Sequence, residues 1–133
     1  MMEQVNQIKS IITSNFTINH TFTGGYEDYI PEAYPSICLT PQAMNKALGD
    51  SLSFDDFDEN DSIAVYYVNQ APENRDQSAF ITKIDSVTSK LMDNPKLNGQ
   101  YNMGVEIGVE YTQRDTQDNI EFIAKITIEG RNV

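Results

Sequence analysis

Ser62-Ile63-Ala64-Val65-Tyr66-Tyr67-Val68, in the middle of the chain, is an almost unbroken run of apolar, β-branched and aromatic residues. Such residues are enriched in β-strands, and a run without polar alternation is typical of a strand that is buried on both faces or lies at an interface. We therefore expect 62–68 to be the central strand of a sheet. Tyr66 is counted among the candidate interface residues.

The segment before this strand predicts a polar loop and a short helix. Residues 50–61 are polar and acidic, as expected of a loop. Thr40 followed by Pro41 is a common helix start, because threonine caps the first turn and proline fits the first helical position. Gly49 can end the helix. We expect this helix at 41–48.

The N-terminal third predicts a helix followed by strands. Apolar residues in 2–14 recur at helical spacing, with polar residues on the other face. Apolar and polar residues alternate in 16–22, which predicts a strand that ends in a glycine turn. A further strand is expected at 36–39, where Cys38, the only cysteine, is interpreted as a core residue.

The segments after the central strand predict one long helix and a β-hairpin. Residues 77–92 have apolar residues at helical spacing and end shortly before a proline. Apolar and polar residues alternate in 105–112 and in 120–129, which predicts two strands with one wet face each. The connector 113–119 is polar and acidic, with Arg114 its only basic residue, and we expect it to project from the sheet.

Together these elements indicate a single domain, residues 1–133, of the α+β class. We expect a mostly antiparallel sheet with helices packed on one face and a C-terminal β-hairpin. The length of 133 residues is usual for one domain. The polar face of the predicted hairpin would be exposed to solvent unless a partner covers it.

The chain is strongly acidic, with 20 acidic and 9 basic residues and a formal charge of -11. This field repels nucleic-acid phosphate and anionic lipid, so we expect no direct nucleic-acid binding. The N-terminus lacks the pattern of a secretion signal, and no apolar run approaches membrane-spanning length. We therefore expect synthesis in the cytoplasm and no membrane association.

Residues that carry catalysis are sparse. His20 is the only histidine, and no cysteine lies near it in sequence to complete a zinc site. We interpret His20 as a hydrogen-bonded core or edge residue that faces the same way as Ile18 and Phe22. No phosphate-binding loop or nucleophile motif occurs in the sequence. We expect no enzymatic activity and no cofactor.

The acidic segment contains a partial match to a calcium-binding loop. Asp56, Asp58 and Asn60 have the spacing of the first three ligands of an EF-hand. The match then fails, because Asp61 stands where a glycine is required and Tyr67 where a bidentate glutamate is required. We therefore expect no metal site.

Acidic residues also recur on the two strands of the predicted hairpin. A pair of them could approach at the spacing of a hydrolase, but the wet face of a hairpin accounts for the same pattern. These residues are Glu106, Glu110, Glu121 and Glu129.

Residues 26–34 are a candidate interface loop. The segment combines three tyrosines with Ile30 outside any regular core pattern, which supplies rigid amphipathic contact area. Local packing over the sheet is the alternative. The candidate interface residues are Tyr26, Tyr29, Ile30, Tyr34, Tyr66, Arg114, Asp115 and Asp118.

The stretch 26–39, with the pattern Tyr-x-x-Tyr-Ile-Pro-x-x-x-Pro-Ser-Ile-Cys-Leu, combines with the order of the elements into a family likeness. The N-terminal helix, the strand at 62–68, the helix at 77–92 and the C-terminal hairpin occur in the same order. In size and order the chain resembles the tail-terminator and neck proteins of tailed phages, which join head and tail. The chain departs from that pattern in the inserted segment 40–61.

The resemblance implies a virion structural protein, made in the host cytoplasm and located in the tail and neck. It implies a homohexameric ring that caps the finished tail tube and presents a surface to the neck connector protein. The strand at 62–68 and the hairpin would form subunit contacts. The connector 113–119 or the loop 50–61 would face a neighbouring ring.

Two other classes remain open. An acidic mimic of DNA would use the negative charge to bind a basic protein, with carboxylates along one face and strong salt dependence. A small hydrolase would need a concave site near His20 or the segment 55–61. A protein-binding domain of another kind is the remaining alternative.

Overall fold

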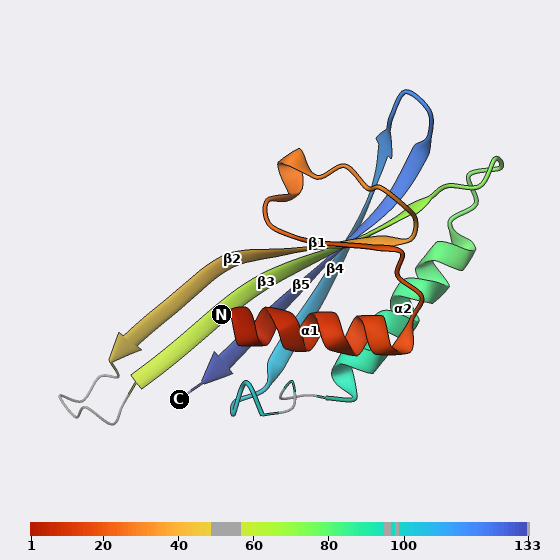
Figure 1. Cartoon of the computed structure of the whole chain (residues 1–133). Helices are drawn as coiled ribbons and strands as arrows, with labels where there is room; N and C mark the ends of the chain where they lie inside the picture. The colour runs from red at the N-terminus through yellow and green to blue at the C-terminus, as the bar shows by residue number, and fades with distance from the viewer. Residues whose placement is uncertain (49–56, 95–96, 98, 133) are drawn as a thin grey trace.

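The computed structural model describes residues 1–48, 57–94, 97 and 99–132. They form two α-helices, five strands and one short 3-10 turn (Figure 1). In chain order these are α1 (Met2–Asn15), β1 (His20–Thr23), η1 (Tyr26–Asp28), β2 (Ser36–Leu48), β3 (Phe57–Gln70), α2 (Ser78–Met92), β4 (Val105–Asp115) and β5 (Ile120–Asn132).

The strands form one sheet in the order β1-β2-β3-β5-β4. β1 pairs with β2 in parallel, and the other three pairs are antiparallel. The fold is therefore α+β with a mostly antiparallel sheet, as predicted, and β4 and β5 form the C-terminal hairpin. β3 contains the run 62–68 and lies third in the sheet, which confirms it as the central strand.

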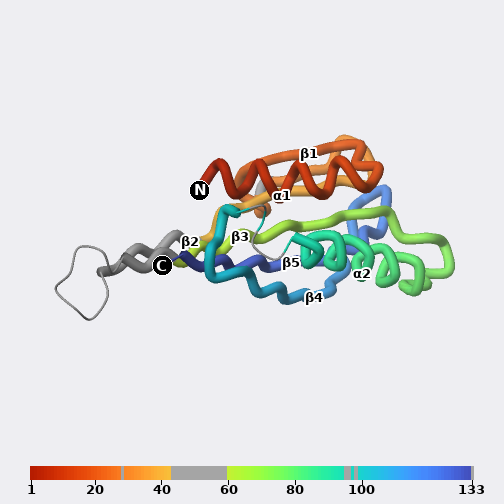
Figure 2. The backbone as a smooth tube through the Cα atoms, turned by 90° about the horizontal axis from the view of Figure 1, so that it is seen from below, coloured from red at the N-terminus to blue at the C-terminus, as the bar shows by residue number. Residues whose placement is uncertain are grey.

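Both helices contribute to the main core. Val5, Ile8 and Ile12 of α1 and Ile84 of α2 pack with alternate residues of β2, β3 and β5. Figure 2 shows α1 lying along the β1–β2 side of the twisted sheet and α2 along the β5–β4 side. The helical spacing of these apolar residues thus buries one stripe of each helix against the same face of the sheet.

The opposite face of the sheet has a smaller core of its own. Cys38, Val68 and Ile123 are buried there beneath Tyr29. Because side chains of a strand alternate between faces, the run 62–68 supplies both cores, and this explains its lack of polar alternation. The prediction that Cys38 is a core residue is confirmed, since its exposed fraction is 0%.

The predicted helix at 41–48 is wrong. These residues continue β2, and they pair with β3 from Pro41 opposite Ile63 to Leu48 opposite Phe57. The register shifts between Pro41 and Ala43, which is typical of a bulge, and proline is tolerated there because β2 is an edge strand beyond Leu39. Strand pairing has therefore overridden a local helix-start signal. Gly49, the predicted helix end, lies outside the described residues.

Other boundaries differ less. The predicted strand at 16–22 is shorter, because α1 extends to Asn15 and β1 begins only at His20. The predicted loop at 50–61 is wrong for 57–61, which belong to β3. The rest of that predicted loop, 50–56, lies outside the described residues. The helices predicted at 2–14 and 77–92 are confirmed as α1 and α2.

Candidate protein interface

The tyrosine-rich segment lies over the second face of the sheet. Tyr29 is 3% exposed and caps the smaller core, while Tyr26, Tyr34 and Tyr66 are half-buried against it. Its chain path crosses back toward β2, so that Asn19 N–H donates to the carbonyl of Pro35 at 2.8 Å. The segment thus covers part of a face that would otherwise be wet.

Three of the predicted interface residues form a stack. The rings of Tyr26 and Tyr66 are nearly parallel, with 3.9 Å between centroids and 6° between planes. The guanidinium of Arg114 lies 5.5 Å from the centroid of the Tyr26 ring. A cation over an aromatic face is attracted by the quadrupole of the ring. The stack therefore joins the loop to β3 and to β4.

Glu121 lies at the centre of this cluster. Its side chain is 1% exposed, and its Oε1 accepts a hydrogen bond from Arg114 Nε at 2.6 Å. The hydroxyl of Tyr34 donates to the other carboxylate oxygen. A buried carboxylate needs both a counter-charge and hydrogen bonds, and Glu121 has them. The prediction that Glu121 belongs to a wet face is therefore wrong, because the tyrosine segment covers this end of the hairpin.

The acidity of Tyr34 follows from this arrangement. Burial, and then the hydrogen bond to the Glu121 carboxylate, raise the pKa of Tyr34 to about 12. Burial also raises the pKa values of Tyr26 and Tyr29. The Tyr34 hydroxyl therefore remains a donor throughout the physiological pH range.

His20 is held by the same segment. Its ring stacks on Tyr29 with 5.6 Å between centroids, and its Nδ1 accepts from the Glu32 N–H at 3.3 Å. Nδ1 also lies within hydrogen-bond distance of the Tyr29 hydroxyl, at 3.1 Å. The interpretation as a hydrogen-bonded edge residue is confirmed. Phe22 also stacks on Tyr29, whereas Ile18 packs in the main core, so the predicted common face of His20 and Ile18 is wrong.

The remaining predicted interface residues are exposed. Ile30, in the same segment, is 82% exposed, the highest fraction among the large apolar side chains of the described residues. Asp115 and Asp118 lie at the end of the hairpin, where β4 pairs with β5 as far as Asp115 opposite Ile120. The connector is thus 116–119 and shorter than predicted, although Figure 1 shows that the hairpin end does project.

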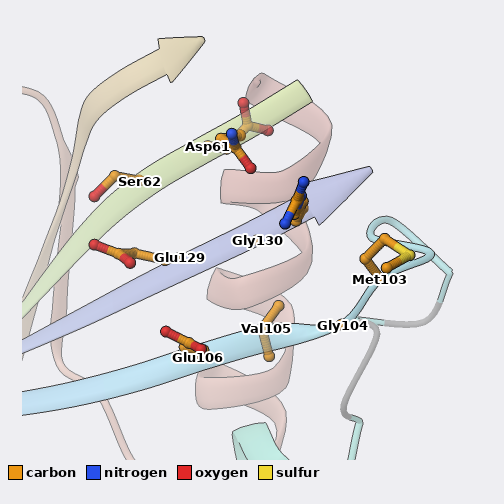
Figure 3. A pocket seen from close by; sticks show the side chains of 10 residues that line it. Asp61, Ser62, Met103, Gly104, Val105, Glu106, Glu129 and Gly130 are labelled. Atoms are coloured by element: carbon orange, nitrogen blue, oxygen red, sulfur yellow. The ribbon is translucent and has the colours of Figure 1, made fainter. Parts of the chain in front are cut away.

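Two carboxylates of the hairpin are direct neighbours. Glu106 is opposite Glu129 in the register, and both are exposed on the face away from the helices. Figure 3 shows them pointing to the same side, with Ser62 of β3 beside them. Glu110 is instead opposite Lys125. Among the described residues, no three His, Cys, Asp or Glu side chains are placed to hold a metal ion. Asp56 lies outside those residues, and Asp58 and Asn60 lie in β3.

One buried polar contact was not predicted. Asp61, 2% exposed, accepts from the hydroxyl of Tyr101 at 2.9 Å, and the Tyr101 ring covers Gly130 of β5. Asp61 also lines a pocket of about 500 Å³ at the strand ends, together with Glu106 and Glu129 (Figure 3). No local pattern joins residues 40 positions apart, so the sequence carries no signal for this pair.

In the part of the chain that the structure describes, no helix is both long and apolar enough to cross a membrane.

The arrangement of tyrosines, Arg114 and Glu121 fixes the segment 26–34 on the sheet and leaves the side chain of Ile30 exposed. No protein-family model matches the chain, and no curated protein matches its sequence.

Proposed function

We propose that this protein is a structural component of a phage virion, a tail terminator that caps the tail tube as a ring and joins it to the neck connector. The resemblance in size and element order supports this proposal. The partners are then further copies of the chain, the tail tube protein and the connector protein. The observation that carries it is the open outer edge of β2 beyond its pairing with β1.

β1 accompanies β2 only from Ser36 to Leu39. From Thr40 to Leu48, β2 pairs with β3 on one side and with no described strand on the other. Figure 1 shows this part of β2 and the start of β3 extending past the N-terminal end of α1. Such an edge presents unpaired backbone donors and acceptors, to which a strand of another molecule can pair.

A repeating assembly would provide that partner. If the β2 edge of one copy pairs with a different surface of the next copy, the contact is head-to-tail. Such contacts close into a ring when the rotation between neighbouring copies permits it. The exposed side chain of Ile30 would add an apolar contact in such an assembly. The net charge of -11 favours protein partners over nucleic acid.

The test is the molar mass of the purified protein by light scattering over a concentration series, with negative-stain images of the largest species. A mass six times the 15.0 kDa of one chain, with ring-shaped particles, supports the proposal. A monomeric mass at every concentration of the series contradicts it.

The alternative of an acidic DNA mimic has less support. Glu106, Glu110 and Glu129 do share one face, as such a mimic requires. Lys125 interrupts the row, however, and the next carboxylate along β5, Glu121, is buried against Arg114. A mimic would be indicated by tight, salt-dependent binding to a DNA-binding protein that is competed by duplex DNA.

A further inference from the structure

β4 forms the other edge of the sheet. All eleven of its residues, Val105–Asp115, pair with β5, and no described strand lies on its outer side. In an antiparallel pair only alternate backbone groups point toward the partner, so the others face outward. A straight edge of this length is a template for an added strand, whose main chain would complete the hydrogen bonds.

The two faces beside this edge differ in chemistry. On the helix side, Val105, Ile107 and Val109 are half-buried against the main core. On the other side, Glu106 and Glu110 are exposed. Because side chains alternate along a strand, an added strand would place one face over the apolar row and the other beside the carboxylates.

Gly108 leaves a hollow in the acidic face. A Cβ atom at Gly108 would meet nothing within 4 Å. Glu106, Glu110, Glu129 and Thr127 line the hollow, whose volume is about 420 Å³. Glycine in a strand often marks a place where another molecule approaches closely. A long side chain opposite Gly108 would therefore lie in this space with its end among three carboxylates.

None of these carboxylates has a basic partner among the described residues. Lys125 is opposite Glu110 in the register, but its ammonium lies over the Tyr66 ring, 6.0 Å from the centroid, and it makes no ion pair with Glu110. Glu106 faces Glu129 directly, and like charges at such positions are destabilising. A cation in the hollow would relieve this repulsion.

A second copy of β4 is a poor occupant of this edge. In the antiparallel register that pairs all eleven residues, Glu110 of one copy faces Glu110 of the other. The same register places Glu106 opposite Arg114, whose guanidinium is already held by Glu121. The repulsion at the centre of such a contact argues for a different strand.

We propose that the open edge of β4 binds an extended segment of another protein by strand addition. The segment has apolar residues on one face, over Val105, Ile107 and Val109, and on the other face a lysine or arginine opposite Gly108. Main-chain hydrogen bonds fix the segment, and the basic residue sets its register and specificity. This inference does not depend on the ring.

The test uses a capped synthetic peptide, Lys-Val-Thr-Ile-Arg-Val-Thr-Ile, and the full chain. Its control peptide has glutamate in place of the two basic residues. The titration is followed by NMR. The basic peptide is expected to shift the signals of the backbone amides of 105–115, and the acidic peptide is expected to leave them unchanged. Binding of the basic peptide should weaken in high salt. Equal effects of the two peptides, or shifts only outside β4, would overturn the proposal.

Variants of the chain sharpen this test. Gly108→Val puts a branched side chain into the hollow at a position where the Cβ atom meets nothing within 4 Å. It is expected to weaken peptide binding about tenfold while the circular dichroism spectrum stays the same. Glu106→Lys with Glu110→Lys is expected to weaken it at least as much. The matched control, Glu3→Lys with Glu73→Lys, makes the same change in charge at exposed sites elsewhere and is expected to leave binding unchanged.

Light scattering separates this inference from the ring. If the β4 variants reduce the oligomer mass in the absence of peptide, the edge is occupied by a second copy and the proposal is wrong. If rings form and the basic peptide does not bind, the inference fails while the proposed function stands. If the protein is a monomer at every concentration and still binds the basic peptide, the inference stands while the proposed function fails.

Discussion

Replacing Arg114 with methionine tests whether the buried ion pair fixes the tyrosine segment on the sheet. The change leaves the carboxylate of Glu121, 1% exposed, without its counter-charge. Removing one partner of a fully buried pair costs about 3–5 kcal/mol. Because the Arg114 side chain is 32% exposed, water can partly replace it, and we expect a loss of about 2–3 kcal/mol in the free energy of unfolding. This corresponds to a fall of about 10 °C in Tm.

The loss can be measured by urea unfolding followed by far-UV circular dichroism, since the chain contains no tryptophan for fluorescence. Lys9→Met removes a positive charge from the exposed face of α1 and is the control, with an expected change within about 0.5 kcal/mol. Adding Glu121→Gln to Arg114→Met removes the unpaired charge and should restore part of the stability. A loss below about 0.5 kcal/mol for Arg114→Met, or no recovery in the double variant, would refute the reasoning.

Three further predictions follow from single positions. Gly130→Ala places a Cβ 2.4 Å from ring atoms of Tyr101 and should destabilise the fold by about 1–3 kcal/mol in urea, whereas Gly108→Ala, with open space at its Cβ, should not. The pKa of Tyr34 is raised to about 12 from an unfolded value near 10, so its contribution is present below about pH 10 and is lost as pH rises toward 12; Tyr34→Phe should show a smaller alkaline loss of stability than the parent chain. Ile30→Ser, at a side chain 82% exposed, should leave Tm nearly unchanged but lower the oligomer mass seen by light scattering, and an unchanged mass would exclude Ile30 from the contact.

Much of the fold could be predicted because its signals are local. α1 and α2 each bury one stripe, so their apolar residues recur at helical spacing. The run 62–68 supplies two cores, so it lacks alternation. The helix predicted at 41–48 failed because the pairing of β2 with β3 is decided by residues on another strand, which a capping pattern cannot report.

The candidate site was only partly predictable. The tyrosine content of 26–34 indicated Tyr26 and Tyr34, whereas Tyr66 came from the predicted strand and Arg114 from the predicted connector. The structure brings the four residues together. Alternation along β5 placed Glu121 on a wet face, because periodicity gives the side of a strand and not what covers it. Its pairing with Arg114 could have been found from the hairpin register, in which the two residues are directly opposite.

The order of the strands also has a consequence for the rate of folding. β2 with β3, and β4 with β5, are antiparallel pairs of strands that follow one another in the sequence, so each pair joins residues that are close along the chain. The seam that joins them, β3 to β5, brings together residues such as Val65 and Ile126 with the whole of α2 between them. Closing that long loop precedes most of the burial in the main core, since both sides of the seam line it. We therefore expect the pairing of β3 with β5 to set the height of the folding barrier. The amides of the β2–β3 and β4–β5 pairs should gain lasting protection from hydrogen exchange only after β3 and β5 have paired.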